Sequence, residues 1–421
     1  RSRNSGIAMR MWVFIVRRAI LIIPVIIGVM TITFALISAL PVSQQLIAHF
    51  GAPGPHDPWI YSPTLQPGQG TCPPAPNTQP CRNNFYYDAI AKLGLDKPIP
   101  LQWATYIFNS LTFQWGTVNN HSTVALQYPD LKDLPVATVL SWYLPYTLEL
   151  AAISLIVILA VAIPLGNLSA VNRNRPVDQA ARVLSFSGFA MPTFLLASLL
   201  LMGFVILIGN ISSTHYLSYT PWCPPGNPLY TEFYGSWPVP LCFQGVTYPA
   251  WMGSGIHTTP TGFPTVDALI HGQGWLAADS LIRMILPAVT IAFGSIAVLL
   301  RFVRNSMLEV MNLDFVRTAR AEGIPQKTVV NRHAGRNSLN VTITVLGLTF
   351  AFFIGGFPVI EYVFHLNGIG LILAYSIQPE PGSVDFGLIF GTTLLFTFII
   401  VIANIIVDVL YAYLDPRVRL G

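Results

Sequence analysis

The chain alternates between long apolar runs and polar connecting segments. Six of the runs contain no aspartate, glutamate, lysine or arginine; they cover residues 19–40, 150–171, 183–211, 284–300, 341–360 and 386–407. Most of them reach the roughly 20 residues that a helix needs to cross about 30 Å of hydrocarbon. This pattern predicts an all-α membrane protein with six transmembrane helices.

The first run has a second interpretation, as the apolar core of a signal peptide, because Arg17 and Arg18 directly precede it. Such a core has roughly 7–15 residues, and the run 19–40 is longer. We therefore expect the run to be retained as the first membrane helix.

Composition supports the membrane class and argues against other classes. Charged residues make up 10% of the chain and hydrophobic residues 53%, whereas soluble domains carry roughly 25% charged residues. The net charge of +4 is small for this length, which argues against a nucleic-acid-binding surface. The sequence has no Gly-Lys dipeptide and hence no Walker A loop for ATP. We expect no catalytic residue, no metal site and no cofactor in this chain.

The basic residues predict which side of the membrane each connection faces. Six spans place both termini on one side, and we assign that side to the cytoplasm. Of the 22 lysines and arginines, those that then fall outside are Arg82, Lys92, Lys97, Lys132 and Arg283. This bias follows the positive-inside rule. It predicts a multi-pass protein of the cell membrane with both termini in the cytoplasm.

The four cysteines lie in segments that the charge rule places outside. Structural disulfides form in oxidising compartments, so their position agrees with the predicted orientation. The pairs Cys72–Cys81 and Cys223–Cys242 close the shortest loops and are the preferred pairing. Four cysteines allow three pairings, and the other two stay open.

The predicted spans and connections divide the chain into three parts. Residues 1–40 form the cytoplasmic amino end and the first span, and residues 41–136 form an external segment. Within that segment we expect a helix at 84–94 and a short apolar helix at 101–115, whose aromatic residues suit the membrane interface. Residues 137–421 form the core, with an irregular external insert at 209–283 and a cytoplasmic loop at 301–339.

Three acidic residues lie close to the ends of the apolar runs: Glu149, Glu361 and Asp408. Ionisable groups at such depths are costly and are often functional. One interpretation is that each hydrogen-bonds to a neighbouring helix at the interface. The other is a role in the transport pathway or in gating, and both stay open.

The most basic stretch, RTARAEGIPQKTVVNRHAGRN, covers residues 317–337. We expect Asp314 to cap a short helix at 315–322 and Gly323 to end it in the left-handed conformation. Pro325 then fits the first turn of a second helix at 325–336. On the first helix, we expect small Ala319 to let another protein surface come close. A simpler interpretation is that the arginines only bind anionic lipid headgroups.

FVRTARAEG and RHAGRN resemble the EAA loop of ABC-transporter permeases, in the form found in the dipeptide, oligopeptide and nickel branch. MWVFIVRRAILIIPVIIGV, LPYTLELA, GGFPVIEYVFHLNGIG and NIIVDVLYAYLDPRVR resemble further blocks of the same family, in order. The resemblance covers most of the chain outside its two large external segments. Arg317 and Thr318 stand where the general EAA pattern has Glu-Ala, as is common in this branch.

The resemblance implies a type I importer permease. Its EAA loop would be a coupling helix that docks on a cytoplasmic ATPase subunit, so that ATP-driven closure of the ATPase dimer moves the spans. The residues that the resemblance assigns to this coupling are Asp314, Phe315, Arg317, Ala319, Arg320, Ala321, Glu322, Gly323 and Pro325.

The partners implied by the resemblance are a second homologous permease, two ATP-binding cassette subunits and an external substrate-binding protein, besides membrane lipid. ATP and Mg would bind to the cassette subunits, and the solute would be a peptide or a similar small molecule. Two hypotheses from other classes are a membrane receptor or scaffold and an ion-coupled secondary transporter. The absence of charge within the spans disfavours the latter.

Overall fold

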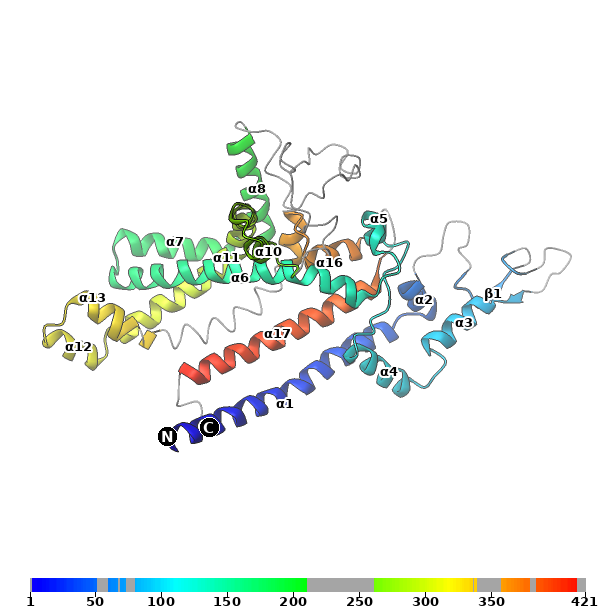
Figure 1. The fold of residues 1–421 in the computed structure, drawn as a ribbon, viewed down its shortest axis with the longest axis horizontal. Helices are drawn as coiled ribbons and strands as arrows, with labels where there is room; N and C mark the ends of the chain where they lie inside the picture. The colour runs from blue at the N-terminus through cyan, green and yellow to red at the C-terminus, as the bar shows by residue number, and fades with distance from the viewer. Residues whose placement is uncertain are drawn as a thin grey trace. The chain divides into compact units, whose positions relative to one another are not determined.

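The structure is a computed structural model that describes residues 2–50, 60–66, 69–72, 80–209, 261–335, 337–338, 357–378 and 384–414 (Figure 1). The chain forms two compact units. The larger unit contains Arg1–Ala19, Trp142–Leu371 and Ile399–Gly421, and the smaller contains Ile20–Ser141 and Ile372–Phe398. The unit boundaries fall inside helices, and the predicted division of the chain by membrane side stays a prediction.

Long apolar helices build the larger unit. Helix α7 (Pro176–Ala190) and helix α11 (Gly274–Val310) run alongside each other, and helix α6 (Val136–Val171) contacts both near its end (Figure 1). Glycines allow this close approach: a Cβ at Gly166 of α6 would lie 2.7 Å from Val303 Cγ1 of α11. Small residues at helix contacts are typical of membrane bundles.

The apolar run 183–211, predicted as the third span, is broken by a sharp bend. Helix α7 ends at Ala190, helix α8 (Thr193–Gly209) begins three residues later, and the two are bent by 111°. Pro192 explains the break, because the residue before a proline avoids the helical conformation. Met191 accordingly has φ −89° and ψ 121°.

The rest of the larger unit consists of shorter elements. Helix α10 (Pro264–Ile270) precedes α11, and helix α12 (Asp314–Ala321), helix α13 (Gln326–Thr328) and the π-helix η4 (Val329–Ala334) follow it. Helix α15 (Phe357–Val363) leads into helix α16 (Ile369–Ile377) through a tight turn, in which His365 has a positive φ of 49°.

The segment predicted to be external, residues 41–136, is more regular than its sequence suggests. It contains helix α2 (Val42–Phe50), the antiparallel strands β1 (Thr64–Leu65) and β2 (Cys81–Arg82), helix α3 (Asn84–Leu93), helix α4 (Ile99–Leu111), helix α5 (Thr123–Gln127) and the 3-10 turn η1 (Pro129–Leu131). The helix predicted at 84–94 is confirmed: Asn83 caps its start and Gly94 ends it with φ 69°. Buried Leu46, Tyr61 and Ala89 form a small core beneath it.

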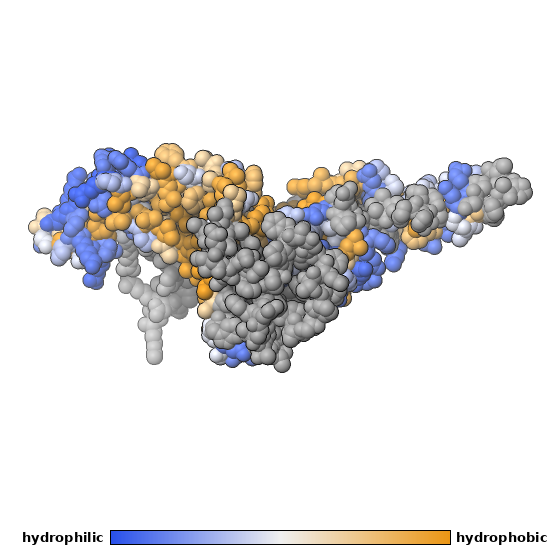
Figure 2. Space-filling view, turned by 90° about the horizontal axis from the view of Figure 1, so that it is seen from above, coloured by the Kyte–Doolittle hydropathy of each residue, from blue (hydrophilic) through white to orange (hydrophobic). Residues whose placement is uncertain are grey.

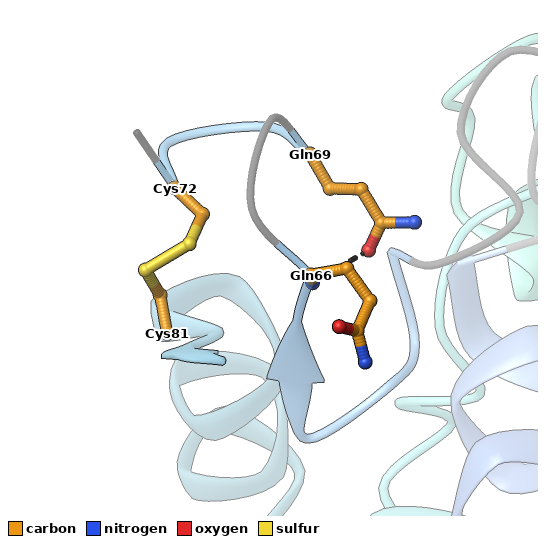
Figure 3. The surroundings of a disulfide bond; sticks show 4 residues. All are labelled: Gln66, Gln69, Cys72 and Cys81. Atoms are coloured by element: carbon orange, nitrogen blue, oxygen red, sulfur yellow. Dashed lines mark hydrogen bonds between the residues drawn. A yellow bond between two sulfur atoms is a disulfide. The ribbon is translucent and has the colours of Figure 1, made fainter. Parts of the chain in front are cut away.

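Cys72 and Cys81 form the predicted disulfide in the smaller unit (Figure 3). The disulfide links the start of β2 to the segment that follows β1. In that segment the Gln66 backbone N–H donates to Gln69 Oε1 at 2.8 Å. The predicted pair Cys223–Cys242 lies outside the described residues.

Three described helices are long and apolar enough to cross a membrane: Val136–Val171, Ser280–Val310 and Phe386–Val407, the last within helix α17 (Phe386–Leu414). The bent pair α7–α8 makes a fourth if it counts as one span. The first predicted span lies in helix α1 (Ser2–Ser38), where Ile23–Ser38 is apolar but shorter. Most of the predicted span 341–360 lies outside the described residues.

Candidate functional site

Helix α12 begins one residue earlier than predicted, and Asp314 is not its cap. Leu313 occupies the cap position with φ −72° and ψ 150°, and it makes no side-chain capping hydrogen bond. Asp314 is instead the first helical residue, where its negative charge still favours the positive end of the helix dipole. Its carboxylate lies 3.3 Å from Arg317 Nη1, and both side chains are mostly exposed.

The predicted end of α12 is confirmed in detail. Gly323 has φ 77°, and its N–H donates to Arg320 O at 3.0 Å. The next N–H, that of Ile324, donates to Ala319 O at 3.2 Å. These two bonds around a left-handed residue make a Schellman motif, which glycine favours because it has no Cβ. The motif fixes the direction in which the chain leaves α12.

One side of α12 is buried within the chain itself, which corrects the prediction for Ala319. Val316 and Ala319, three residues apart, pack against the end of α11, a residue of α6 and the π-helix η4. The other buried members of this cluster are Ala170, Met307, Val310, Val329 and Ala334. Ala319 therefore anchors α12 and does not present an open surface to a partner.

The opposite side of α12 is exposed and carries both polar and apolar groups. Phe315, Arg317, Arg320, Ala321 and Glu322 are all exposed. Figure 2 shows hydrophilic residues gathered at the end of the unit where α12 and α13 lie, beside a hydrophobic band over the neighbouring helices. An exposed two-turn helix with a buried anchor is suited to contact a partner at a fixed angle.

The second helix of the loop is less regular than predicted. Pro325 is the cap of α13 and not part of its first turn, and α13 lasts only three residues. The backbone continues as the π-helix η4, in which Gly335 N–H bonds back to Val330 O. Short π segments occur often at functional sites. Arg336, where the predicted helix ends, lies outside the described residues.

Glu149 lies within α6, which begins at Val136, well before the apolar run that starts at residue 150. Its side chain is buried, and its Oε1 accepts a hydrogen bond of 3.2 Å from the Thr265 backbone N–H in the first turn of α10. Among the described residues, Oε2 has no hydrogen-bond partner. Its role in a pathway stays a prediction.

Glu361 is almost completely buried and stabilises the start of α16. Its Oε2 accepts from Gly370 N–H at 2.6 Å, and its Oε1 accepts from Thr147 Oγ1 at 2.8 Å. Thr147 Oγ1 in turn accepts from Ile369 N–H at 2.9 Å. A Cβ at position 368 would overlap the Glu361 carboxylate, which explains why this position is a glycine. These bonds match the simpler interpretation of a structural contact, and a gating role remains untested.

Asp408 lies in α17, and its side chain is outside the described part of the structure. Within the described residues, no group of three or more histidine, cysteine, aspartate or glutamate side chains lies where it could hold a metal ion.

Sequence reasoning missed Asp178, near the start of α7. Its fully buried carboxylate accepts hydrogen bonds from Ser169 Oγ at 2.6 Å and from Asn174 N–H at 2.9 Å. Arg182 Nη2 and Arg304 Nε each lie 2.6 Å from it. The available signal was Pro176 at the first helical position with an acid two residues later, a pattern typical of helix starts. That signal could not reveal the arginine on α11.

Apolar helices long enough to cross a membrane, joined to an exposed amphipathic loop helix, define a multi-pass membrane protein. The chain belongs to the family described as the binding-protein-dependent transport system inner membrane component, which matches residues 162–420. The matched region includes α12 and the buried acids Asp178 and Glu361.

Several curated proteins are similar over most of their length. The probable D,D-dipeptide transport system permease protein DdpB of Escherichia coli K12 is 32% identical over 330 residues, or 78% of this chain and 83% of the relative. The dipeptide transport system permease protein DppB of the same strain is 28% identical over 96% of this chain and 98% of the relative. The oligopeptide transport system permease protein AppB of Bacillus subtilis 168 is 28% identical over 96% and 99%.

Proposed function

We propose that this chain is the transmembrane permease subunit of an ATP-driven importer of peptides or similar small solutes. Membership of the binding-protein-dependent family supports an import system with an external substrate-binding protein. The names of the similar proteins, which are dipeptide and oligopeptide permeases, support peptides as the solute class.

The proposed importer contains a second homologous permease subunit and two ATP-binding cassette subunits, which hold ATP and Mg. The chain lies in the cell membrane with both termini in the cytoplasm, and the distribution of its basic residues supports this orientation. The loop with α12 is then cytoplasmic and can reach the cassette subunits.

Helix α12 carries the coupling in this proposal. Its buried side, Val316 and Ala319, is fixed to the end of α11, so a force on its exposed side moves α11 as well. The exposed side offers Phe315 for an apolar contact and Arg317 for a charged one. ATP-driven closure of the cassette dimer pulls on α12 and changes the access of the spans, which requires no catalytic group in this chain.

The test changes the exposed side of α12 without disturbing its anchor. In the assembled importer, reconstituted in liposomes, we expect the double variant Phe315→Ala, Arg317→Glu to reduce ATP-dependent peptide uptake by about tenfold or more. As central contacts of the docking surface, the two residues would be among the few that cost about 2 kcal/mol or more when lost, roughly 30-fold in affinity. The peptide affinity of the external binding protein should not change.

The matched control is Lys132→Glu, which reverses an exposed charge in the first external segment. It should leave uptake unchanged. Uptake by the α12 double variant at the wild-type rate would refute the coupling role of α12. Uptake driven by an ion gradient without cassette subunits would refute the proposed function as a whole.

A further inference from the structure

The two arginines that contact Asp178 differ in what they connect. Arg182 lies one turn further along the same helix α7, and its side chain is 46% exposed. Arg304 comes from α11, and its side chain is only 14% exposed. Its Nε lies 2.6 Å from Oδ1 and its Nη2 3.0 Å from Oδ2, so the guanidinium binds both carboxylate oxygens. Of these two arginine contacts, that of Arg304 joins two helices, α7 and α11.

The Asp178–Arg304 pair lies at one end of a close helix contact. Ten residues further along α7, a Cβ at Gly188 would lie 2.6 Å from Ala297 Cβ of α11. Helices α7 and α11 thus touch at a charged contact and at a contact of small residues. They are antiparallel, because the residue number rises along α7 and falls along α11 from the first contact to the second. Bidentate arginine–carboxylate pairs restrict geometry more than a single hydrogen bond does. The pair therefore fixes the register of α7 against α11.

Helix α11 leads from this pair directly to α12. Met307 and Val310, which follow Arg304 by three and six residues, pack against Val316 and Ala319 of α12. Ser306 Oγ also donates to Ser338 O at 3.2 Å, beyond the π-helix. A displacement of α12 is thereby carried into the part of α11 that holds Asp178. At its other end, α7 turns by 111° into α8.

We propose that Asp178 and Arg304 are a positioning pair that makes α7, α11 and α12 move as one arm. The pair does not touch the solute. It transmits the movement of the docking helix to α7 and so to the bend before α8. The role rests on the proposed function, because it requires α12 to be pulled by a cassette subunit.

The experiment separates transmission from ATP hydrolysis. The importer, assembled with its partner permease, cassette subunits and binding protein, is reconstituted with Arg304→Gln, and peptide uptake and ATP hydrolysis are measured in the same liposomes. We expect ATP hydrolysis to continue while the number of peptides imported per ATP falls by about fivefold or more, as for the loss of a typical coupling energy. The conservative variant Arg304→Lys, which retains the charge but not the two-pronged contact, should restore part of the ratio.

Arg182→Gln is the matched control, because it removes an arginine from the same carboxylate without separating two helices. It should import the wild-type number of peptides per ATP. A wild-type ratio in Arg304→Gln, or an equal loss in both variants, would overturn the proposal. If Arg304→Gln does not assemble, a wild-type ratio in Arg304→Lys overturns it instead. A wild-type importer without ATP-dependent uptake would contradict the proposed function, and the role of the arm with it. A wild-type ratio in Arg304→Gln beside normal ATP-dependent uptake would contradict the arm alone.

Discussion

Each compact unit contains a buried aspartate that joins distant parts of the chain, and the two are bound differently. Asp178 of the larger unit is bound by two guanidinium groups as well as by neutral donors. Asp385 of the smaller unit accepts from Leu388 N–H at 3.0 Å and from Asn119 N–H, 266 residues away, at 2.8 Å. Burial raises the pKa of Asp385, although its hydrogen bonds act in the opposite direction.

The difference shows that burial alone does not define the role of a carboxylate. A carboxylate paired with arginine keeps its charge and depends on a specific partner. A carboxylate held by backbone dipoles caps a helix, here α17, and its ionised form is penalised by burial. Two predictions test this contrast, and a third concerns the disulfide of the smaller unit.

The largest effect should come from removing the charge at Asp178. Asp178→Asn should lower the free energy of unfolding by about 3–5 kcal/mol, because the largely buried Arg304 loses its counter-ion. Asp385→Asn should cost less, about 1–3 kcal/mol, because asparagine can still cap α17 with its one amide oxygen but leaves the Asn119 N–H without an acceptor. Denaturant titration of the two full-length variants in detergent measures both. Equal losses would remove the contrast.

A smaller effect should follow from reducing the disulfide of the smaller unit. Cys72 and Cys81 are nine residues apart. A disulfide that closes a loop of that length stabilises the folded state by about 2–3 kcal/mol, because it lowers the entropy of the unfolded chain. We expect faster hydrogen exchange in β2 and α3 after reduction, with α7 unchanged. The variant Cys72→Ser, Cys81→Ser should behave like the reduced protein. Unchanged hydrogen exchange in α3 would contradict the prediction, because the small core around Leu46 would then hold α3 in place without the disulfide.

The smallest effect is a pH dependence at Asp385. Its folded pKa is raised above the ordinary value of 3.8, so its contribution to stability is fully present below that value and is lost as pH rises through the folded pKa. Asp385→Asn should flatten this part of the profile. Melting curves of the full chain from about pH 4 to 7 provide the measurement, with exposed Asp130→Asn as a control that keeps the wild-type slope. A flat wild-type profile would contradict the prediction.

The features that sequence predicted correctly depend on a few neighbouring residues. The helix at 84–94 and the left-handed Gly323 follow from local backbone preferences. Pro192 was visible in the third run, but a proline alone did not reveal a bend as sharp as 111°. The cap at Asp314 was wrong by one residue, which is the usual uncertainty of a helix end.

The features that sequence could not predict depend on residues far apart in the chain. Ala319 looked like an open face because its small size is local information, whereas its burial depends on Ala170, Met307 and Ala334. Asp178 showed only the pattern of a helix start, and its partner Arg304 is 126 residues away.

The sequence by itself determined the membrane class, the family resemblance and the helix that ends at Gly323, and it favoured the Cys72–Cys81 pairing that the structure has. These follow from hydrophobicity, loop length and backbone conformation, which act over a few residues. Only the tertiary structure decided which side of α12 is anchored and which is free, and that a buried ion pair joins α7 to α11. Those outcomes require the packing of separate helices against one another, because burial and charge pairing depend on residues that the order of the chain does not place together.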